Sequence, residues 1–159
     1  MIKLNIVCVG KIKEDYFDKA CREYQKRLSR YCKLEITEIA PERLPENPSK
    51  EEINSALKKE AVQIIKKLPE QSFKISLCVE GKAKTSEGLA KLIGEKTDIG
   101  KNIVFIIGGS YGLCESIKEM SDLKLSLSEM TFPHRLFRVM LLEQIYRSFK
   151  INEGGNYHK

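Results

Sequence analysis

Hydrophobic residues follow two spacings along this chain, and the two spacings alternate. Short apolar runs bounded by glycine, proline or polar residues are typical of strands. They fall at residues 3–9, 34–39, 73–79, 103–107 and 124–127. Between them, apolar residues recur at steps of three and four, which predicts helices at residues 15–31, 50–67, 86–93, 113–120 and 135–150. This order predicts an α/β fold with a largely parallel sheet.

Turn and cap residues support these boundaries. Ser49 and Glu52 have the spacing of a capping box and open the second predicted helix. Three prolines keep residues 41–48 out of regular structure. Ser86 is the expected cap of the third helix. No linker or change of composition interrupts the pattern, so residues 1–159 are predicted to form a single domain.

The last predicted helix is apolar around most of its circumference. Such a helix needs cover on more than one side. Two explanations remain open from the pattern alone: a helix buried within its own subunit, or one that packs against a second copy of the chain.

Charge and length narrow the classes of protein. The chain has 159 residues, with 28 Lys and Arg against 22 Asp and Glu, a net charge of +6. This excess favours polyanionic partners only mildly. No apolar run approaches the ~20 residues of a membrane span. The first apolar run lacks a signal-peptide cleavage site, so we expect a cytoplasmic protein.

The five cysteines do not indicate a metal site. They are widely spaced and form no C-x-x-C pair, and the chain has only two histidines. A structural zinc site needs four grouped ligands. We therefore expect no metal and reduced cysteines that pack as small hydrophobic residues.

A basic ridge follows the first predicted helix, at Lys19, Arg22, Lys26 and Arg30. A solvated face partly paired with nearby acids is the simpler interpretation of this ridge. A nucleic-acid contact is the other.

The clearest candidate for a ligand site follows the fourth strand, where Gly108, Gly109 and Gly112 precede a helix. Ligands bind at the carboxyl ends of parallel strands, and glycine allows close backbone approach. The pattern is neither G-x-G-x-x-G nor a P-loop, so it gives little support to a dinucleotide or ATP site. A tight structural turn is the alternative.

Two further segments carry candidate chemistry. Pro133 precedes His134 at the start of the last helix, where the helix dipole tends to depress an imidazole pKa. The tail ends in Tyr157 and His158. A structural histidine and a frayed terminus are the ordinary alternatives.

Together these segments resemble the bacterial ribosomal RNA large subunit methyltransferase H family, a minimal group within the SPOUT methyltransferases. The similarity runs the full length. It rests on the order and spacing of residues 3–11, 77–82, 108–112, 127–135, 143–147 and 157–159.

The resemblance implies an S-adenosylmethionine-dependent enzyme. Its substrate would be N3 of a pseudouridine in helix 69 of 23S ribosomal RNA, within the assembled 70S ribosome. It also implies a homodimer and a SPOUT fold whose C-terminal trefoil knot forms the cofactor pocket. In such a dimer the tail of one subunit reaches the pocket of the other.

Residue roles follow from the same resemblance. The expected cofactor-binding residues are Leu77, Gly108, Leu127, Ser128, Glu129, Met130, Thr131 and Phe132. The candidates for the catalytic proton transfer are His134, Arg147, Tyr157 and His158. Expected RNA contacts are Arg135 and Arg138, with Lys19, Arg22 and Lys26 from the ridge. Glu143, four residues before Arg147, is expected to pair with it.

Two rivals remain. One is a non-catalytic RNA-binding or ribosome-associated protein of the same fold that uses the basic ridge. The other is a hydrolase-like enzyme or nucleotide binder, which the missing G-x-S-x-G elbow and P-loop do not favour.

Overall fold

The computed structural model describes residues 1–157, and their strands form one parallel sheet. The strands are β1 (Ile2–Val9), β2 (Cys32–Ile39), β3 (Phe73–Ala83), β4 (Ile103–Ile107) and β5 (Leu123–Ser126). Their order across the sheet is β2-β1-β4-β3-β5, and every neighbouring pair is parallel. The predicted α/β fold with a mainly parallel sheet is confirmed.

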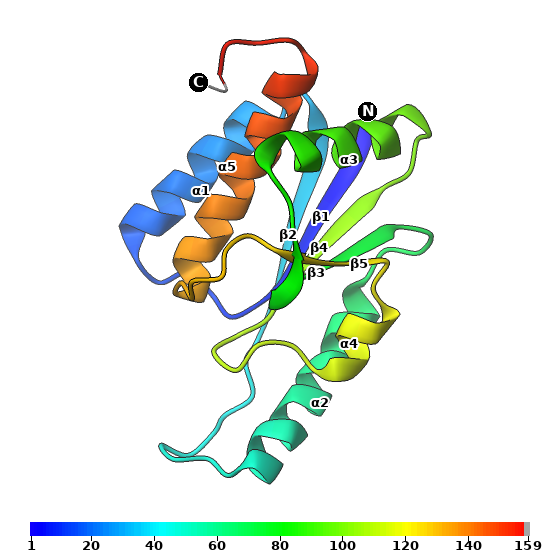
Figure 1. Cartoon of the computed structure of the whole chain (residues 1–159). Coiled ribbons are helices and arrows are strands. Elements are labelled where there is room, and N and C mark those ends of the chain that lie inside the picture. Colours follow the sequence, from blue (N-terminus) through cyan, green and yellow to red (C-terminus); the bar gives the residue numbers. More distant parts are fainter. Residues whose placement is uncertain (158–159) are drawn as a thin grey trace.

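Helices cover both faces of this sheet (Figure 1). One face carries α1 (Asp15–Leu28), α3 (Ser86–Asp98) and α5 (His134–Asn152). The other carries α2 (Lys50–Lys67) and the short α4 (Glu115–Met120). Helix α5 contacts both α1 and α3. Because two helices and the sheet already cover it, its wide apolar surface does not by itself require a second subunit.

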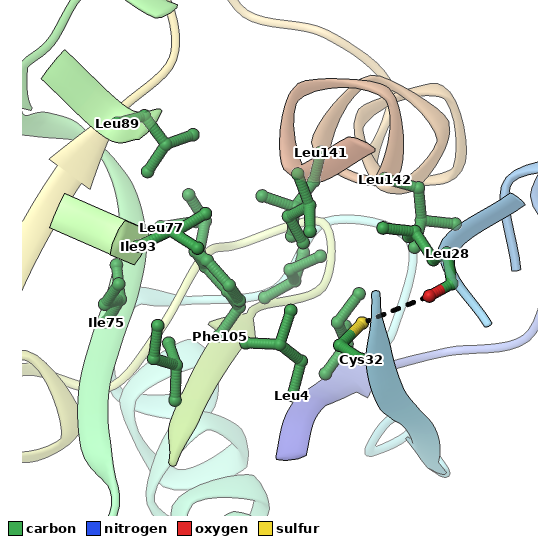
Figure 2. Close-up of a cluster of buried hydrophobic side chains, with 14 of the residues drawn as sticks. Leu4, Leu28, Cys32, Ile75, Leu77, Leu89, Ile93, Phe105, Leu141 and Leu142 are labelled. Atoms are coloured by element: carbon green, nitrogen blue, oxygen red, sulfur yellow. Dashed lines mark hydrogen bonds between the residues drawn. The ribbon is translucent and has the colours of Figure 1, made fainter. Parts of the chain in front are cut away.

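The two cores meet at β4, whose five residues are all buried. Its side chains alternate between the faces: Phe105 enters the core under α5, and Ile106 enters the core under α2. Figure 2 shows the larger core, with Phe105 between Leu4 and Leu77 and beneath Leu141. The wholly apolar strand predicted from the sequence is thus buried on both sides.

Several element ends differ from the predicted ones. Thr85, not Ser86, caps α3, since its Oγ1 accepts a hydrogen bond from the Gly88 N–H at 3.0 Å. Ser86 instead donates to Gln144 on α5 at 2.7 Å. Helix α4 begins at Glu115 rather than 113, and α5 begins one residue early, at His134.

Strand β3 runs four residues beyond its predicted end and meets β5 twice. Leu77 and then Lys82 both pair with Leu125, and residues 78–81 bulge between them. A Cβ on Gly81 would lie 2.7 Å from the Leu125 carbonyl carbon, so only glycine allows the backbones to come so close. Strand β3 therefore stays paired with β5 on both sides of the bulge. The trefoil knot implied by the resemblance stays a prediction.

The described residues contain neither a membrane-spanning helix nor a cluster of metal ligands. Residues 1–157 contain no helix that is long and apolar enough to cross a membrane. Over the same range, no three His, Cys, Asp or Glu side chains are grouped so as to hold a metal ion.

Candidate functional site

A cavity of about 660 Å³ opens where β3, β4 and β5 end. Three segments form its wall: residues 77–80 at the bulge of β3, residues 107–113 at the end of β4, and residues 126–134 at the end of β5, with Glu129 not lining it. Lys118 of α4 and Phe137 of α5 complete it. The cavity thus lies at the carboxyl edge of a parallel sheet, where open α/β folds bind ligands.

The glycine turn after β4 brings bare backbone to this cavity. The Gly112 N–H donates to the Gly109 carbonyl at 3.0 Å, which closes the turn. A Cβ on Gly108 would collide with the carbonyl oxygen of Gly112. Position 108 therefore accepts only glycine, because the Gly112 backbone occupies the space that a Cβ would need. The segment is therefore the tight turn that was one of the two alternatives, and it also lines the cavity.

The segment after β5 forms the opposite wall. The Ser126 hydroxyl donates to the Ser128 carbonyl at 3.0 Å, and the Ser128 hydroxyl accepts from the Met130 N–H at 3.0 Å. These local bonds hold the loop in shape, and the Met130 side chain is 73% exposed at the rim.

Seven of the eight residues that the resemblance assigns to the cofactor lie on this one wall: Leu77, Gly108, Leu127, Ser128, Met130, Thr131 and Phe132. Glu129 is exposed and is not among the lining residues. The segments that carry the seven are up to 55 positions apart in the chain, and the sheet brings them together.

Two charged residues of the wall were missed by the sequence analysis. Lys118 forms an ion pair with Glu80, and the Lys118 side chain is only 15% exposed. The hydrogen bond from Lys118 lowers the pKa of Glu80. Burial works against the charge on Lys118, but Glu80 outweighs it and raises the Lys118 pKa. No sequence pattern links two residues 38 positions apart, one in the bulge of a strand and one on a six-residue helix.

His134 also lines the cavity, at the first residue of α5. Burial lowers its pKa below the ordinary 6.5, and the positive charges of Arg135 and Arg138 lower it further. The lowered pKa of His134 that the sequence predicts is confirmed in direction. The imidazole is therefore neutral at pH 7 and able to accept a proton.

The two arginines that follow are held inside the protein. Arg138 is 6% exposed, and its guanidinium donates to Glu38 at 3.1 Å and to the Gly10 carbonyl at 3.0 Å. So enclosed a side chain has no face left for the predicted RNA contact. Arg135 is partly buried and paired with Glu14. Both arginines attach α5 to the segment that follows β1.

Arg147 and Tyr157 lie together but not on the cavity wall. Arg147 donates to Glu143 at 2.9 Å, as expected, and to the Tyr157 carbonyl at 3.3 Å. Its guanidinium stacks over the Tyr157 ring, 4.8 Å from the centroid. The Tyr157 ring in turn packs edge-on against Tyr146. The fourth catalytic candidate, His158, lies outside the described residues.

Glu143, the partner of Arg147, lines a separate cavity of about 430 Å³ between α3 and α5. Glu143, Leu125 and Leu127 are among the residues that line it. Leu127 lines both cavities, so the two cavities are neighbours.

Two of the four residues of the basic ridge on α1 pair with acids of the same helix. Lys19 pairs with Asp15 and Arg22 pairs with Asp18, each at 2.8 Å and one turn apart. Exposed pairs of this kind are typical of a solvated helix face. The structure thus favours the simpler of the two interpretations of the ridge.

Comparison with known proteins identifies the family to which this chain is similar. A family model described as "Predicted SPOUT methyltransferase" matches residues 2–158. A protein of Methanococcus maripaludis, provisionally named ribosomal RNA large subunit methyltransferase H, is 55% identical over 159 residues. A Clostridium novyi protein with that name is 48% identical over 159 residues. Each alignment covers 99% of this chain and 100% of the relative.

A solved structure supports the fold independently. It is described as a probable methylase family protein from Haemophilus influenzae and has a TM-score of 0.55 at 12% identity. The match covers 98% of this chain and 70% of the other.

Proposed function

This chain belongs to the SPOUT methyltransferase family, and from that premise we propose that it methylates 23S ribosomal RNA with S-adenosylmethionine. The acceptor in this proposal is N3 of a pseudouridine in helix 69 of the assembled 70S ribosome. The observation that carries the proposal is the convergence of seven expected cofactor residues on one cavity wall. The relatives named ribosomal RNA large subunit methyltransferase H supply the substrate class.

The residues of the cavity suit S-adenosylmethionine. Leu77, Leu127 and Phe132 give apolar surface for the adenine, and Gly108 lines the cavity beside them. Lys118 and Glu80 together match the carboxylate and ammonium of the methionyl group. When bound, the cofactor supplies an electrophilic methyl group on a sulfonium.

The chain's own residues then have two tasks. The wall residues hold the donor in line with the acceptor nitrogen, since positioning supplies much of the rate enhancement of a displacement. A second group must accept the proton that leaves N3. Neutral His134 on the wall is a candidate within this subunit.

Arg147, Tyr157 and His158 enter this proposal through a homodimer. Because Arg147 and Tyr157 do not border the cavity of their own subunit, the proposed active site is composite. The tail of one subunit would complete the cavity of its partner. Arg147 would there bind an RNA phosphate or steady the anion that forms as N3 loses its proton.

The decisive experiment is mass spectrometry of 23S RNA from cells lacking this gene. We expect the N3-methylated pseudouridine to disappear and to return when the purified protein and S-adenosylmethionine are added to the 70S ribosomes. Persistence of the modification would remove the assignment. Ribosome binding without methyl transfer would instead indicate the non-catalytic alternative.

A further inference from the structure

The segment between β1 and α1, residues 10–14, is fastened to the first turns of α5. Arg138 donates to the Gly10 carbonyl at 3.0 Å, and Arg135 pairs with Glu14. A Cβ on Gly10 would lie 3.5 Å from Nε2 of His134. Because His134 lines the cavity, this segment forms the surface next to the cavity's His134 end.

The segment carries two cations that the protein does not neutralise. Lys11 and Lys13 are both exposed. Among residues 1–157 neither takes part in an ion pair, whereas the adjacent acids Glu14 and Asp15 are paired with Arg135 and Lys19. The positive charge of the two lysines is therefore open to an anionic partner.

An exposed aromatic ring stands beside these cations. Tyr16 is 67% exposed although its ring packs edge-on against Phe17, with 4.5 Å between the centroids. A supported ring with a free face provides a stacking platform at little cost in conformational entropy.

We propose that Lys11, Lys13 and Tyr16 form a docking surface for unpaired RNA beside the nucleotide to be methylated. The two ammonium groups bind phosphates of the flanking backbone, and Tyr16 stacks on a base. Cations along the backbone together with an aromatic platform are what recognition of single-stranded RNA requires. This inference rests on the proposed function, and it locates RNA recognition at the segment before α1 and the first turn of that helix.

A second copy of this chain is the other occupant to consider. Charge complementarity favours RNA, because each copy carries a net charge of +6 and two unpaired lysines would face it. The experiment must distinguish RNA binding from binding of a second copy.

Three variants test the surface: Lys11→Gln with Lys13→Gln, Tyr16→Ala, and the control Lys66→Gln with Lys67→Gln. The control removes two exposed lysines from α2, on the opposite face of the sheet. Affinity for unmethylated 70S ribosomes is measured by filter binding at several salt concentrations. Calorimetry with S-adenosylmethionine and size-exclusion chromatography report on the cofactor site and the oligomeric state.

We expect loss of Lys11 and Lys13 to make the logarithmic salt slope shallower by about 1.4, since each single-strand phosphate contact contributes roughly 0.7. We expect Tyr16→Ala to weaken binding about five-fold or more with the slope retained. The control keeps the wild-type affinity and slope, and all variants keep the wild-type cofactor affinity.

Wild-type affinity and slope in both test variants would overturn this inference and leave the proposed function standing. Conversion to monomer by Tyr16→Ala would overturn it in favour of a subunit interface. A wild-type protein that neither binds nor methylates ribosomes would remove the proposed function and this inference with it.

Discussion

Arg135 and Glu14 form an ion pair although 121 positions separate them. The pair joins the first turn of α5 to the residues that precede α1, and Arg138 adds a second connection one turn later. The first residue of α5, His134, is thereby fixed between the cavity and Gly10. The cavity's edge thus depends on contacts between opposite ends of the chain.

Replacing Arg138 by Met should destabilise the fold. The change removes two hydrogen bonds of a buried guanidinium, to Glu38 and to the Gly10 carbonyl, and leaves those acceptors short of a donor. We expect the free energy of unfolding to fall by about 2 kcal/mol in urea titrations. Arg22→Met, which breaks an exposed pair, should cost less than about 0.5 kcal/mol. Equal losses would contradict the structural role of Arg138.

Gly108→Ala should weaken cofactor binding. The added Cβ collides with the Gly112 carbonyl, so the turn that forms one wall of the cavity must open. We expect affinity for S-adenosylmethionine, measured by calorimetry, to drop by about ten-fold or more, the equivalent of about 1.4 kcal/mol. The control is Gly94→Ala in α3, where the new Cβ meets only the end of the Asn152 side chain. Normal binding by Gly108→Ala would place the cofactor elsewhere.

Lys118→Met should discriminate between two ligands. We assign the ammonium of Lys118 to the carboxylate of the methionyl group, which 5′-methylthioadenosine lacks. We therefore expect roughly ten-fold weaker binding of S-adenosylmethionine, in line with a lost hydrogen bond between charged groups, and unchanged binding of methylthioadenosine. Lys91→Met, on the exposed side of α3, serves as the control. Equal weakening of both ligands would indicate damage to the cavity.

The pH dependence of methylation should report His134. Because burial and the neighbouring arginines lower its pKa, the imidazole stays neutral below its ordinary 6.5, and activity should fall only at lower pH. Arg135→Gln removes one positive neighbour of His134. The fall in activity on the acidic side of the pH profile, the acid limb, should therefore move to higher pH. His134→Asn should lose that limb together with most activity. An acid limb at the same pH in all three proteins would exclude His134 as the proton acceptor.

The same shift affects stability, with a definite sign. The native state resists protonation of His134, so the unfolded chain binds more protons as the pH falls through 6.5. Stability contributed by this group is therefore present above pH 6.5 and lost below it. In urea titrations, the stability of the wild type relative to His134→Asn should therefore fall as the pH is lowered through 6.5, because only the wild type carries the titrating group.

Deleting residues 156–159 should separate binding from catalysis. The deletion removes Tyr157, which packs on Arg147 and Tyr146, but no residue of the cavity wall. We expect cofactor binding and the dimer to survive while methylation is lost. If the tail acts on the partner subunit, mixing this variant with Gly108→Ala should restore activity. Normal activity of the truncated protein would remove the tail from the mechanism.

Much of the architecture could be read from the pattern of apolar residues. Strand β4 is wholly apolar and lies buried at the centre of the sheet, as its composition predicts. Element ends were less predictable where two residues competed for one role. Thr85 and Ser86 are both good caps, and only the hydrogen bond from Ser86 to Gln144 on α5 shows which one is free to cap α3.

Some residues of the candidate site could also be predicted from the sequence, and others could not. The glycines after β4 and the segment 127–132 were identified in advance because their residue types restrict the backbone or resemble a known family. Lys118 and Glu80 were not, because their partnership depends on how α4 packs beside the end of β3. Arg138 has the sequence character of a surface cation, yet the segment after β1 encloses it.

By itself, the sequence determined the alternation of strands and helices, the buried central strand and the family, because periodicity and local motifs are properties of neighbouring residues. Only the tertiary structure decided which distant groups meet. It brought three segments around one cavity, placed Arg147 and Tyr157 outside it, and, within residues 1–157, left the exposed Lys11 and Lys13 without an ion pair. The physical reason is that burial and electrostatic pairing depend on distances in space, which spacing along the chain does not fix.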